Sequence, residues 1–161
     1  MAVIADTHMP RGRRRLPPAC LDHLRGADVV LHAGDLTGPV FLDELARLGP
    51  PVHAVFGNAD EAAVRARLPE RLVVELETSR IGIVHDPGPL RGRHDRLVGW
   101  FPSCDAVVFG HTHLPQVERH GRVWLLNPGS PTERRRSAAR SMLLLELGMN
   151  GVRPELVELA P

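Results

Sequence analysis

Short apolar segments that end abruptly in polar residues recur along the first two thirds of the chain. Residues 2–5, 28–33, 52–56 and 105–109 are mainly apolar segments of strand length, and candidate helices lie at residues 19–25, 40–48, 61–68 and 95–100. An alternation of strands and helices is typical of βαβ units, which build parallel sheets. The pattern therefore constrains the first half of the chain to an α/β arrangement.

Pairs of strand-like segments around short turns follow this alternation. They are residues 71–77 and 80–85 around Thr78-Ser79, residues 116–119 and 122–126 around His120-Gly121, and residues 141–147 and 152–159 around a Gly-rich turn. Such spacing predicts hairpins and hence antiparallel strands. A mixed-sheet α/β sandwich accommodates both patterns, and a length of 161 residues fits one domain over residues 1–161.

Composition excludes several classes of protein. The 20 basic residues are all Arg and are balanced by 19 acidic residues, so a net charge of +1 argues against a general nucleic-acid coat. Cys20 and Cys104 lie too far apart to form a CxxC zinc motif or a disulfide framework. The sequence has neither the pattern of a secretory leader nor an apolar run of membrane-spanning length. We therefore expect a cytoplasmic protein without membrane contact.

Polar clusters stand where five of the expected strands end. They are Asp6-Thr7-His8, Gly34-Asp35, Gly57-Asn58-Ala59-Asp60, His85-Asp86 and Gly110-His111-Thr112-His113. Ligands of open α/β sheets bind outside the carboxyl ends of the strands, so these clusters are expected to converge. Carboxylate, imidazole and carboxamide groups without Cys suit Mn²⁺, Fe, Zn²⁺ or Ni²⁺ better than Ca²⁺ or Mg²⁺. The glycines at 34, 57 and 110 would allow the backbone to approach closely.

The number and spacing of these residues carry further information. Asp6 and His8, and likewise His111 and His113, are two residues apart, which places each pair on one face of an extended segment. A single Asp or His at a strand end is more often a cap or loop residue, but five ordered clusters are far more specific. Two metals that share a bridging carboxylate would use all seven ligand-type residues. The other five His are interpreted as surface or core residues: His23, His32, His53, His94 and His120.

In this order the clusters resemble the signature of the calcineurin-like metallophosphoesterase superfamily, and most of all its small, single-domain bacterial and archaeal phosphodiesterases. The stretch Asn127-Pro128-Gly129-Ser130 is also typical of that small subfamily. The resemblance implies a four-layer α/β/β/α sandwich with two metals at one edge of the sheets. It implies that Asp6, His8, Asp35 and His113 hold one metal, and that Asp35, Asn58, His85 and His111 hold the other. Two divalent transition-metal ions are expected, Mn²⁺ before Ni²⁺, Zn²⁺ or Fe.

The function implied by the resemblance is hydrolysis of a small-molecule phosphate ester, with phosphodiesters preferred. A hydroxide bridging the two metals would attack phosphorus in line, and Asp35, Asn58 and His111 would take part in catalysis. Many members of the superfamily carry a His where this chain has Ala59, and Ala cannot protonate a leaving group. Asp86 stands where Gly is usual. It could orient His85 or begin the turn at Asp86-Pro87-Gly88, and the turn is favoured.

Two alternatives stay open at this point. The same fold serves a retromer subunit as a non-catalytic scaffold for protein binding, so the fold alone does not establish catalysis. The runs Arg13-Arg14-Arg15 and Arg134-Arg135-Arg136 could grip a nucleic-acid backbone, which would make the protein a nuclease, although short Arg runs are more often solvated surface. The sequence leaves the assembly open, with a homodimer as the commonest arrangement.

Overall fold

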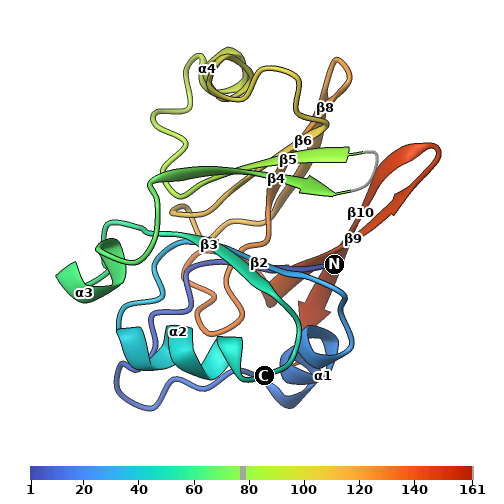
Figure 1. Cartoon of the computed structure of the whole chain (residues 1–161). Helices are drawn as coiled ribbons and strands as arrows, with labels where there is room; N and C mark the ends of the chain where they lie inside the picture. The colour runs from blue at the N-terminus through green and yellow to red at the C-terminus, as the bar shows by residue number, and fades with distance from the viewer. Residues whose placement is uncertain (77–78, 161) are drawn as a thin grey trace.

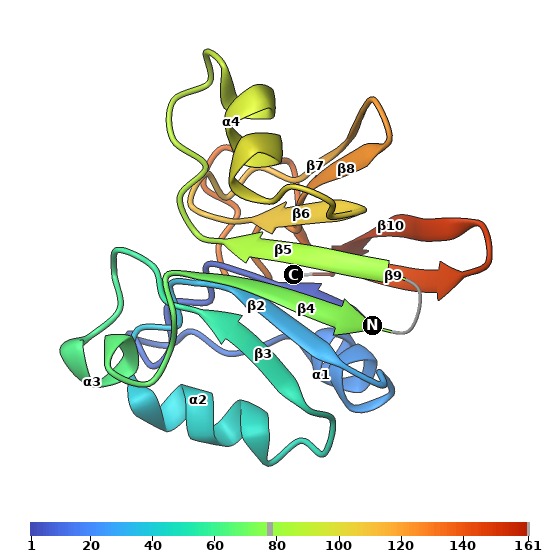
Figure 2. The ribbon, with the colours of Figure 1, turned by 45° about the horizontal axis from the view of Figure 1, so that its top comes forward.

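Two five-stranded sheets face each other in the computed structural model, which describes residues 1–76 and 79–160 (Figures 1 and 2). The first sheet has the order β10 (Gly151–Leu159), β9 (Arg140–Gly148), β1 (Ala2–Ile4), β2 (Val30–Ala33), β3 (Val52–Val55). The second has the order β4 (Arg71–Leu76), β5 (Ser79–Val84), β6 (Ala106–Phe109), β8 (Val123–Asn127), β7 (Gln116–His120).

Helices cover the outer faces of both sheets, which makes the four layers that the family resemblance implied. Helices α1 (Pro18–Arg25) and α2 (Pro39–Ala46) cover the first sheet, and α4 (Arg93–Trp100) covers the second (Figure 2). The short α3 (Ala62–Arg65) follows β3. None of these helices is long and apolar enough to cross a membrane.

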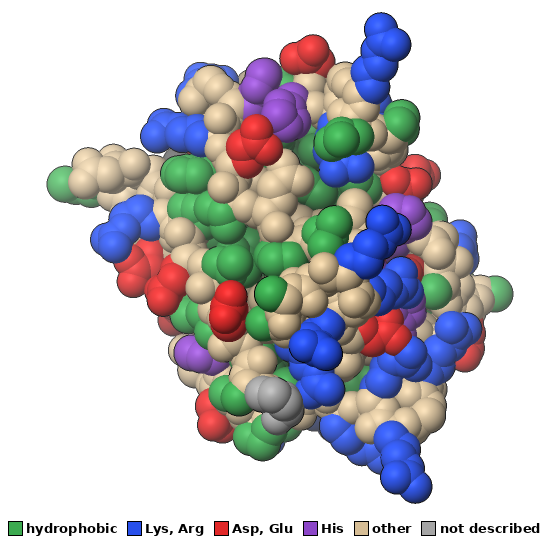
Figure 3. Space-filling view, turned by 180° about the vertical axis from the view of Figure 1, so that it is seen from behind, with side chains coloured by type: hydrophobic (Ala, Val, Ile, Leu, Met, Phe, Trp, Pro, Cys, Tyr) green, Lys and Arg blue, Asp and Glu red, His purple; other side chains and the backbone are tan. Residues whose placement is uncertain are grey.

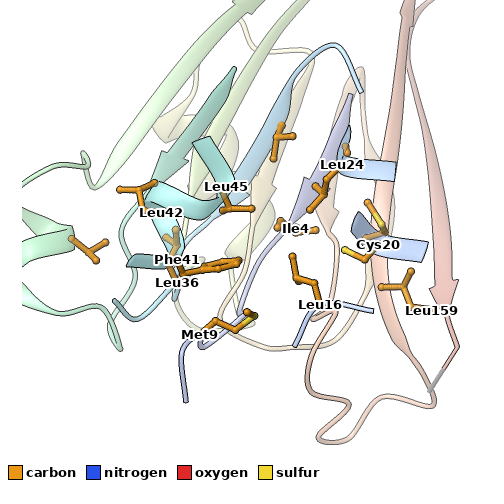
Figure 4. Packing of buried hydrophobic residues seen from close by; sticks show 14 residues of the cluster. Ile4, Met9, Leu16, Cys20, Leu24, Leu36, Phe41, Leu42, Leu45 and Leu159 are labelled. Carbon is orange, nitrogen blue, oxygen red and sulfur yellow. The ribbon is translucent and has the colours of Figure 1, made fainter. Parts of the chain in front are cut away.

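The period-two alternation of the strands divides the apolar residues among the layers. In β1, Ile4 packs with Leu24 of α1 and Leu45 of α2 in the cluster of Figure 4, whereas Val3 faces the second sheet and packs in the cluster that contains Ile81. Burial on both faces explains why β1, β2 and β6 read as continuous apolar runs rather than as alternating strands.

The strand directions confirm one expectation and correct another. Strands β1, β2 and β3 are parallel, as the strand–helix alternation predicted. The hairpins β4–β5, β7–β8 and β9–β10 are antiparallel, as expected. The expectation of antiparallel pairing through the second half was too broad, because β5, β6 and β8 pair in parallel at the centre of the second sheet. Helix α4 and the loop after His111 supply the crossovers, which hairpin signals do not reveal. Thr78 of the predicted turn lies outside the described residues.

Candidate metal centre

The seven predicted ligand residues come from five loops, each of which follows the carboxyl end of a strand. Asp6 and His8 follow β1, Asp35 follows β2, and Asn58 follows β3 in the first sheet. His85 follows β5, and the pair His111 and His113 follows β6 in the second sheet. The structure brings side chains that are up to 107 residues apart in sequence, as Asp6 and His113 are, into contact at one edge of the sandwich.

One group of ligand atoms forms around His113. Its Nε2 lies 3.3 Å from Nε2 of His8 and 3.2 Å from Oδ1 of Asp6. Nε2 of His8 lies 3.6 Å from Oδ2 of Asp35. Asp6, His8 and His113 thus present ligand atoms within 4.8 Å of one another, a spacing that a single metal ion could bridge.

A second group forms on the other side of Asp35. Nε2 of His85 lies 3.4 Å from Oδ1 of Asp35 and 3.0 Å from Oδ1 of Asn58, and Nδ1 of His111 lies 2.8 Å from the same Asn58 oxygen. Asp35 turns one carboxylate oxygen toward each group. Asp6 also lies within reach of Asp35 and His85, a closeness that the sequence did not indicate.

The seven residues differ in burial: five form the base of the site and two lie at its opening, which we call the mouth. Asp6, His8, Asp35, His85 and His113 are buried, whereas Asn58 and His111 are exposed. Asp6 and Asp35 meet no Arg within ion-pair distance in the described chain; their ionisable partners are His side chains. Buried carboxylates need a compensating positive charge, and the donor set of imidazole nitrogens and carboxylate oxygens fits divalent transition-metal ions.

Burial and neighbouring groups shift the pKa values of three ionisable side chains in the site. Burial by itself would raise the pKa of Asp35, but the hydrogen bond and charge of His85 and the N–H of Ala59 outweigh it and lower the pKa to about 2. Burial would lower the pKa of His85, but Asp35 and Asp6 outweigh it and raise the pKa. The pKa of His8 is lowered, chiefly by burial. The site therefore favours an ionised Asp35 carboxylate.

Asp60 ties two loops of the site together through three backbone hydrogen bonds. Its Oδ2 accepts hydrogen bonds from the backbone N–H of Gly57 at 2.7 Å and of Asp35 at 3.1 Å, and its Oδ1 accepts one from Thr37 at 2.5 Å. Burial raises the pKa of this carboxyl group. Asp60 thus holds the loops after β2 and β3 against each other instead of ligating.

Close backbone approach requires the small residues that the sequence placed at these strand ends. A Cβ at Gly34 would lie 2.7 Å from the side chain of His85, and a Cβ at Gly57 would collide with the Asp35 carboxylate. The ligands themselves are also conformationally unusual, because the backbones of Asp6, His8, Asp35, His111 and His113 all have φ between 46° and 69°. Non-glycine residues rarely adopt this left-handed region, and such strain concentrates at functional sites.

Sequence reasoning missed the residues that orient the site. Glu133 Oε2 lies 3.6 Å from Nδ1 of His113, and the backbone oxygen of Ala33 lies 2.9 Å from Nδ1 of His85. Asn127 donates to the backbone oxygen of Gly110 at 2.9 Å, and Ser130 donates to that of Asp6 at 2.8 Å. The Asn127–Ser130 stretch was recognised as a motif, and its role is to pin two ligand loops. Glu133 carries no comparable sequence signal.

The remaining expectations concern residues beside the site. The carboxylate of Asp86 accepts from the N–H of Gly88 at 2.8 Å, so the turn interpretation is confirmed. His32 is a core residue, fully buried and 3.0 Å from the Thr7 hydroxyl. The other four non-ligand His lie at least partly exposed away from the site: His23, His53, His94, His120.

A cleft of about 450 Å³ opens beside Asn58 and His85. Its walls include two aromatic rings, each covered by an Arg guanidinium. Cζ of Arg65 lies 5.0 Å from the ring centre of Phe56, and Cζ of Arg71 lies 3.8 Å from that of Trp100. The edge of the sandwich thus offers room for an organic group next to the ligand group around Asn58 and His85.

Comparison with known proteins agrees with this site. Residues 1–150 match the family model of the calcineurin-like phosphoesterase superfamily domain. A probable metallophosphoesterase of Methanothermobacter thermautotrophicus is 38% identical over 146 residues, which cover 89% of this chain and 84% of that protein.

Two solved structures extend the comparison to the fold. A Thermotoga maritima protein solved by NMR has a TM-score of 0.77 at 33% identity and covers 98% of both chains. Wild-type Vps29 of Entamoeba histolytica in complex with Zn²⁺ has a TM-score of 0.75 at 28% identity and covers 98% of this chain and 97% of its own. The chain therefore belongs to the calcineurin-like phosphoesterase superfamily.

Proposed function

We propose that the protein is a dinuclear metal-dependent phosphodiesterase. The observation that carries the proposal is the pair of ligand groups that share Asp35, one around His113 and one around His85 and Asn58. Asp6, His8, Asp35 and His113 would hold one ion, and Asp35, Asn58, His85 and His111 would hold the other. Two bound divalent ions supply a nucleophile at neutral pH and neutralise charge on a phosphoryl group. Mn²⁺ is the ion we expect first.

Four of the chain's own residues have distinct roles in the proposed reaction. Asp35 spans both groups, so it fixes their separation. The exposed Asn58 and His111 stand at the mouth, where an incoming phosphate meets them first. His85 is oriented by the backbone oxygen of Ala33, which favours a proton on Nδ1 and leaves Nε2 free to bind an ion.

The leaving group is the weak point of the proposed reaction. The methyl side chain of Ala59 cannot donate a proton, although its backbone N–H holds the Asp35 carboxylate at 2.7 Å. The proton must therefore come from solvent. We expect the rate to rise steeply as the leaving group becomes more acidic, which makes aryl phosphodiesters better substrates than alkyl ones.

The test is hydrolysis of bis(4-nitrophenyl) phosphate by protein stripped with chelator and reloaded with Mn²⁺, Ni²⁺ or Zn²⁺. We expect activity with at least one metal and two ions bound per chain. Asp35→Asn and His111→Ala should abolish it, whereas His120→Ala, at an exposed His outside the site, should not. A folded protein that carries two ions and hydrolyses nothing with any metal would refute catalysis.

A scaffold role is the second candidate, because the structural relatives include Vps29. Such a role does not require metal, whereas here seven ligand-type side chains converge. A chain that retains no stoichiometric metal after incubation with each ion would favour the scaffold. Retained metal alone does not decide between the two candidates, because the Vps29 of Entamoeba histolytica was also solved in complex with Zn²⁺, so the hydrolysis assay is the deciding measurement.

A further inference from the structure

Arginine is distributed unevenly along the chain. Residues 10–17 and 128–140 contain eight Arg and one acidic residue, Glu133, which gives these two loops a formal charge of +7. The remaining 12 Arg and 18 acidic residues give the rest of the chain a charge of −6. The net charge of +1 therefore conceals a strong separation of charge, which creates a positive field over part of the surface.

The two loops meet and line an open surface pocket of about 570 Å³. Five Arg and Glu133 line it: Arg11, Arg13, Arg14, Arg15 and Arg140 are the basic residues. In Figure 3 the Arg side chains gather over the lower right of the face shown. We call this feature the arginine pocket.

Most of the guanidinium groups in the arginine pocket lack an acidic partner. Arg14 forms an ion pair with Glu133, and Arg135 lies 3.3 Å from the same carboxylate. Within the described part of the chain, the other four lining Arg form no ion pair: Arg11, Arg13, Arg15 and Arg140. Unpaired guanidinium groups that converge on one pocket repel each other, and an anion would relieve this repulsion.

The arginine pocket adjoins the metal centre through two contacts. Glu133, in its wall, also contacts His113, with Oε2 3.6 Å from Nδ1. Thr132, in the same wall, donates to the backbone oxygen of Thr7 at 2.9 Å, between Asp6 and His8. An anion in the arginine pocket would therefore lie beside the His113 group and on the side away from the cleft at Asn58 and His85.

We propose that the arginine pocket binds a phosphate group of the substrate other than the one that is hydrolysed. The inference rests on the proposed function and narrows the substrate class to phosphodiesters that carry at least one further phosphate. Guanidinium groups suit this ligand because they offer paired donors to phosphate oxygens and stay charged at all physiological pH values. Glu133 does not oppose it, because Arg14 and Arg135 already neutralise that carboxylate.

Two matched substrates test the proposal. Thymidine 3′-(4-nitrophenyl phosphate) and its 5′-phosphorylated form share the scissile bond and leaving group and differ in the distal phosphate alone. With Mn²⁺-loaded protein at low ionic strength, we expect kcat/KM to be about tenfold or more higher for the phosphorylated form. Arg11→Gln combined with Arg140→Gln should bring this ratio close to one.

The control removes the same charge elsewhere. Arg47 and Arg122 are exposed and form no ion pair in the described chain, so the double variant Arg47→Gln/Arg122→Gln should keep the wild-type ratio. A wild-type ratio near one would overturn the proposal. So would an equal loss in both double variants, because it would mean that net charge and not the arginine pocket selects the substrate.

A binding measurement separates this inference from the proposed function. Calorimetry on metal-free protein should give a Kd for thymidine 3′,5′-bisphosphate that is about tenfold higher in Arg11→Gln/Arg140→Gln than in wild type and unchanged in Arg47→Gln/Arg122→Gln, whether or not the enzyme turns over. Equal Kd values for wild type and Arg11→Gln/Arg140→Gln would refute the arginine pocket even in an active enzyme. A 5′-phosphorylated tetranucleotide then identifies the source: tighter binding with a steeper salt dependence indicates a nucleic-acid strand, and unchanged affinity indicates a small bisphosphate.

Discussion

Replacing Asp60 by Asn tests whether one buried carboxylate holds the loops of the metal centre together. Asp60 accepts three backbone hydrogen bonds, from Gly57, Asp35 and Thr37, and has 6% of its surface exposed. Asn has nearly the same shape, but one of its two terminal atoms is an NH₂ group that cannot accept. At least one backbone N–H therefore loses its partner, and the amide N–H faces that donor.

The magnitude follows from these contacts. A hydrogen bond to a charged acceptor contributes about 1.5–3 kcal/mol, and a buried unsatisfied donor adds a cost of similar size. The loss is offset in part because the neutral amide removes the burial cost that raises the pKa of Asp60 and its repulsion from Asp35. We expect a net decrease of about 2 kcal/mol in the free energy of unfolding, which corresponds to a Tm about 4–8 °C lower for a protein of this size.

The assay is urea unfolding of metal-free protein at pH 7, with chelator present so that metal affinity does not contribute. Asp43→Asn is the matched control, because Asp43 is exposed and contacts Arg67 on the surface; we expect no measurable change there. If Asp60→Asn unfolds at the same urea concentration as wild type and the control, Asp60 does not organise the loops as argued. A separate titration with Mn²⁺ should then give wild-type affinity as well.

Three further predictions concern metal, pH and orientation. Mn²⁺ at 100 times its Kd should raise the free energy of unfolding by about 2.7 kcal/mol, chelator should reverse this, and His113→Ala should remove the effect; a Tm indifferent to metal would contradict the site. The pKa of His32 is lowered by burial from 6.5 to about 3, so its contribution to stability is present above pH 6.5 and is lost as pH falls. At pH 5 the loss is about 2 kcal/mol relative to pH 7.5, and urea unfolding of metal-free His32→Gln should show a shallower pH dependence by that amount. Glu133→Gln should weaken Mn²⁺ binding about 10–100-fold in calorimetry because it no longer stabilises a proton on Nδ1 of His113; unchanged affinity would mean that the 3.6 Å contact has no orienting role.

Local sequence signals predicted a mixed-sheet α/β sandwich and the convergence of the seven site residues, and the family resemblance added the four layers. Strands that are buried on both faces have mainly apolar sequences. The polar residues that follow them therefore indicated where the edge of the sheets lies. Parallel pairing of β1, β2 and β3 follows from the crossover helices between them. The glycines at 34 and 57 indicated that the backbone approaches other groups closely, and the structure places the side chains of His85 and Asp35 against them.

Other features depend on tertiary contacts that a single sequence does not encode locally. Glu133 becomes part of the site because residues 128–133 return to the loop after β1, more than 100 residues away in sequence. The arginine pocket has the same origin, since the Arg-rich loop of residues 11–15 meets Thr132, Glu133 and Arg140 only in the fold. In the second sheet, helix α4 joins the parallel pair β5 and β6. The parallel pair β6 and β8 is joined through β7 without a helix, so no strand–helix alternation indicates its direction.

At five positions the left-handed backbone makes the stability of the fold compete with the proposed metal binding. These positions are Asp6, His8, Asp35, His111 and His113. Glycine adopts this conformation without steric cost, and Asn tolerates it better than most residues, so a descendant of this protein that stopped using metal could become more stable by accepting either at these positions. Substitutions that only increase the stability of the fold would thus first replace the proposed ligands. Asp and His at all five positions therefore carry a conformational cost that glycine would not, and binding at the proposed metal centre would have to offset it.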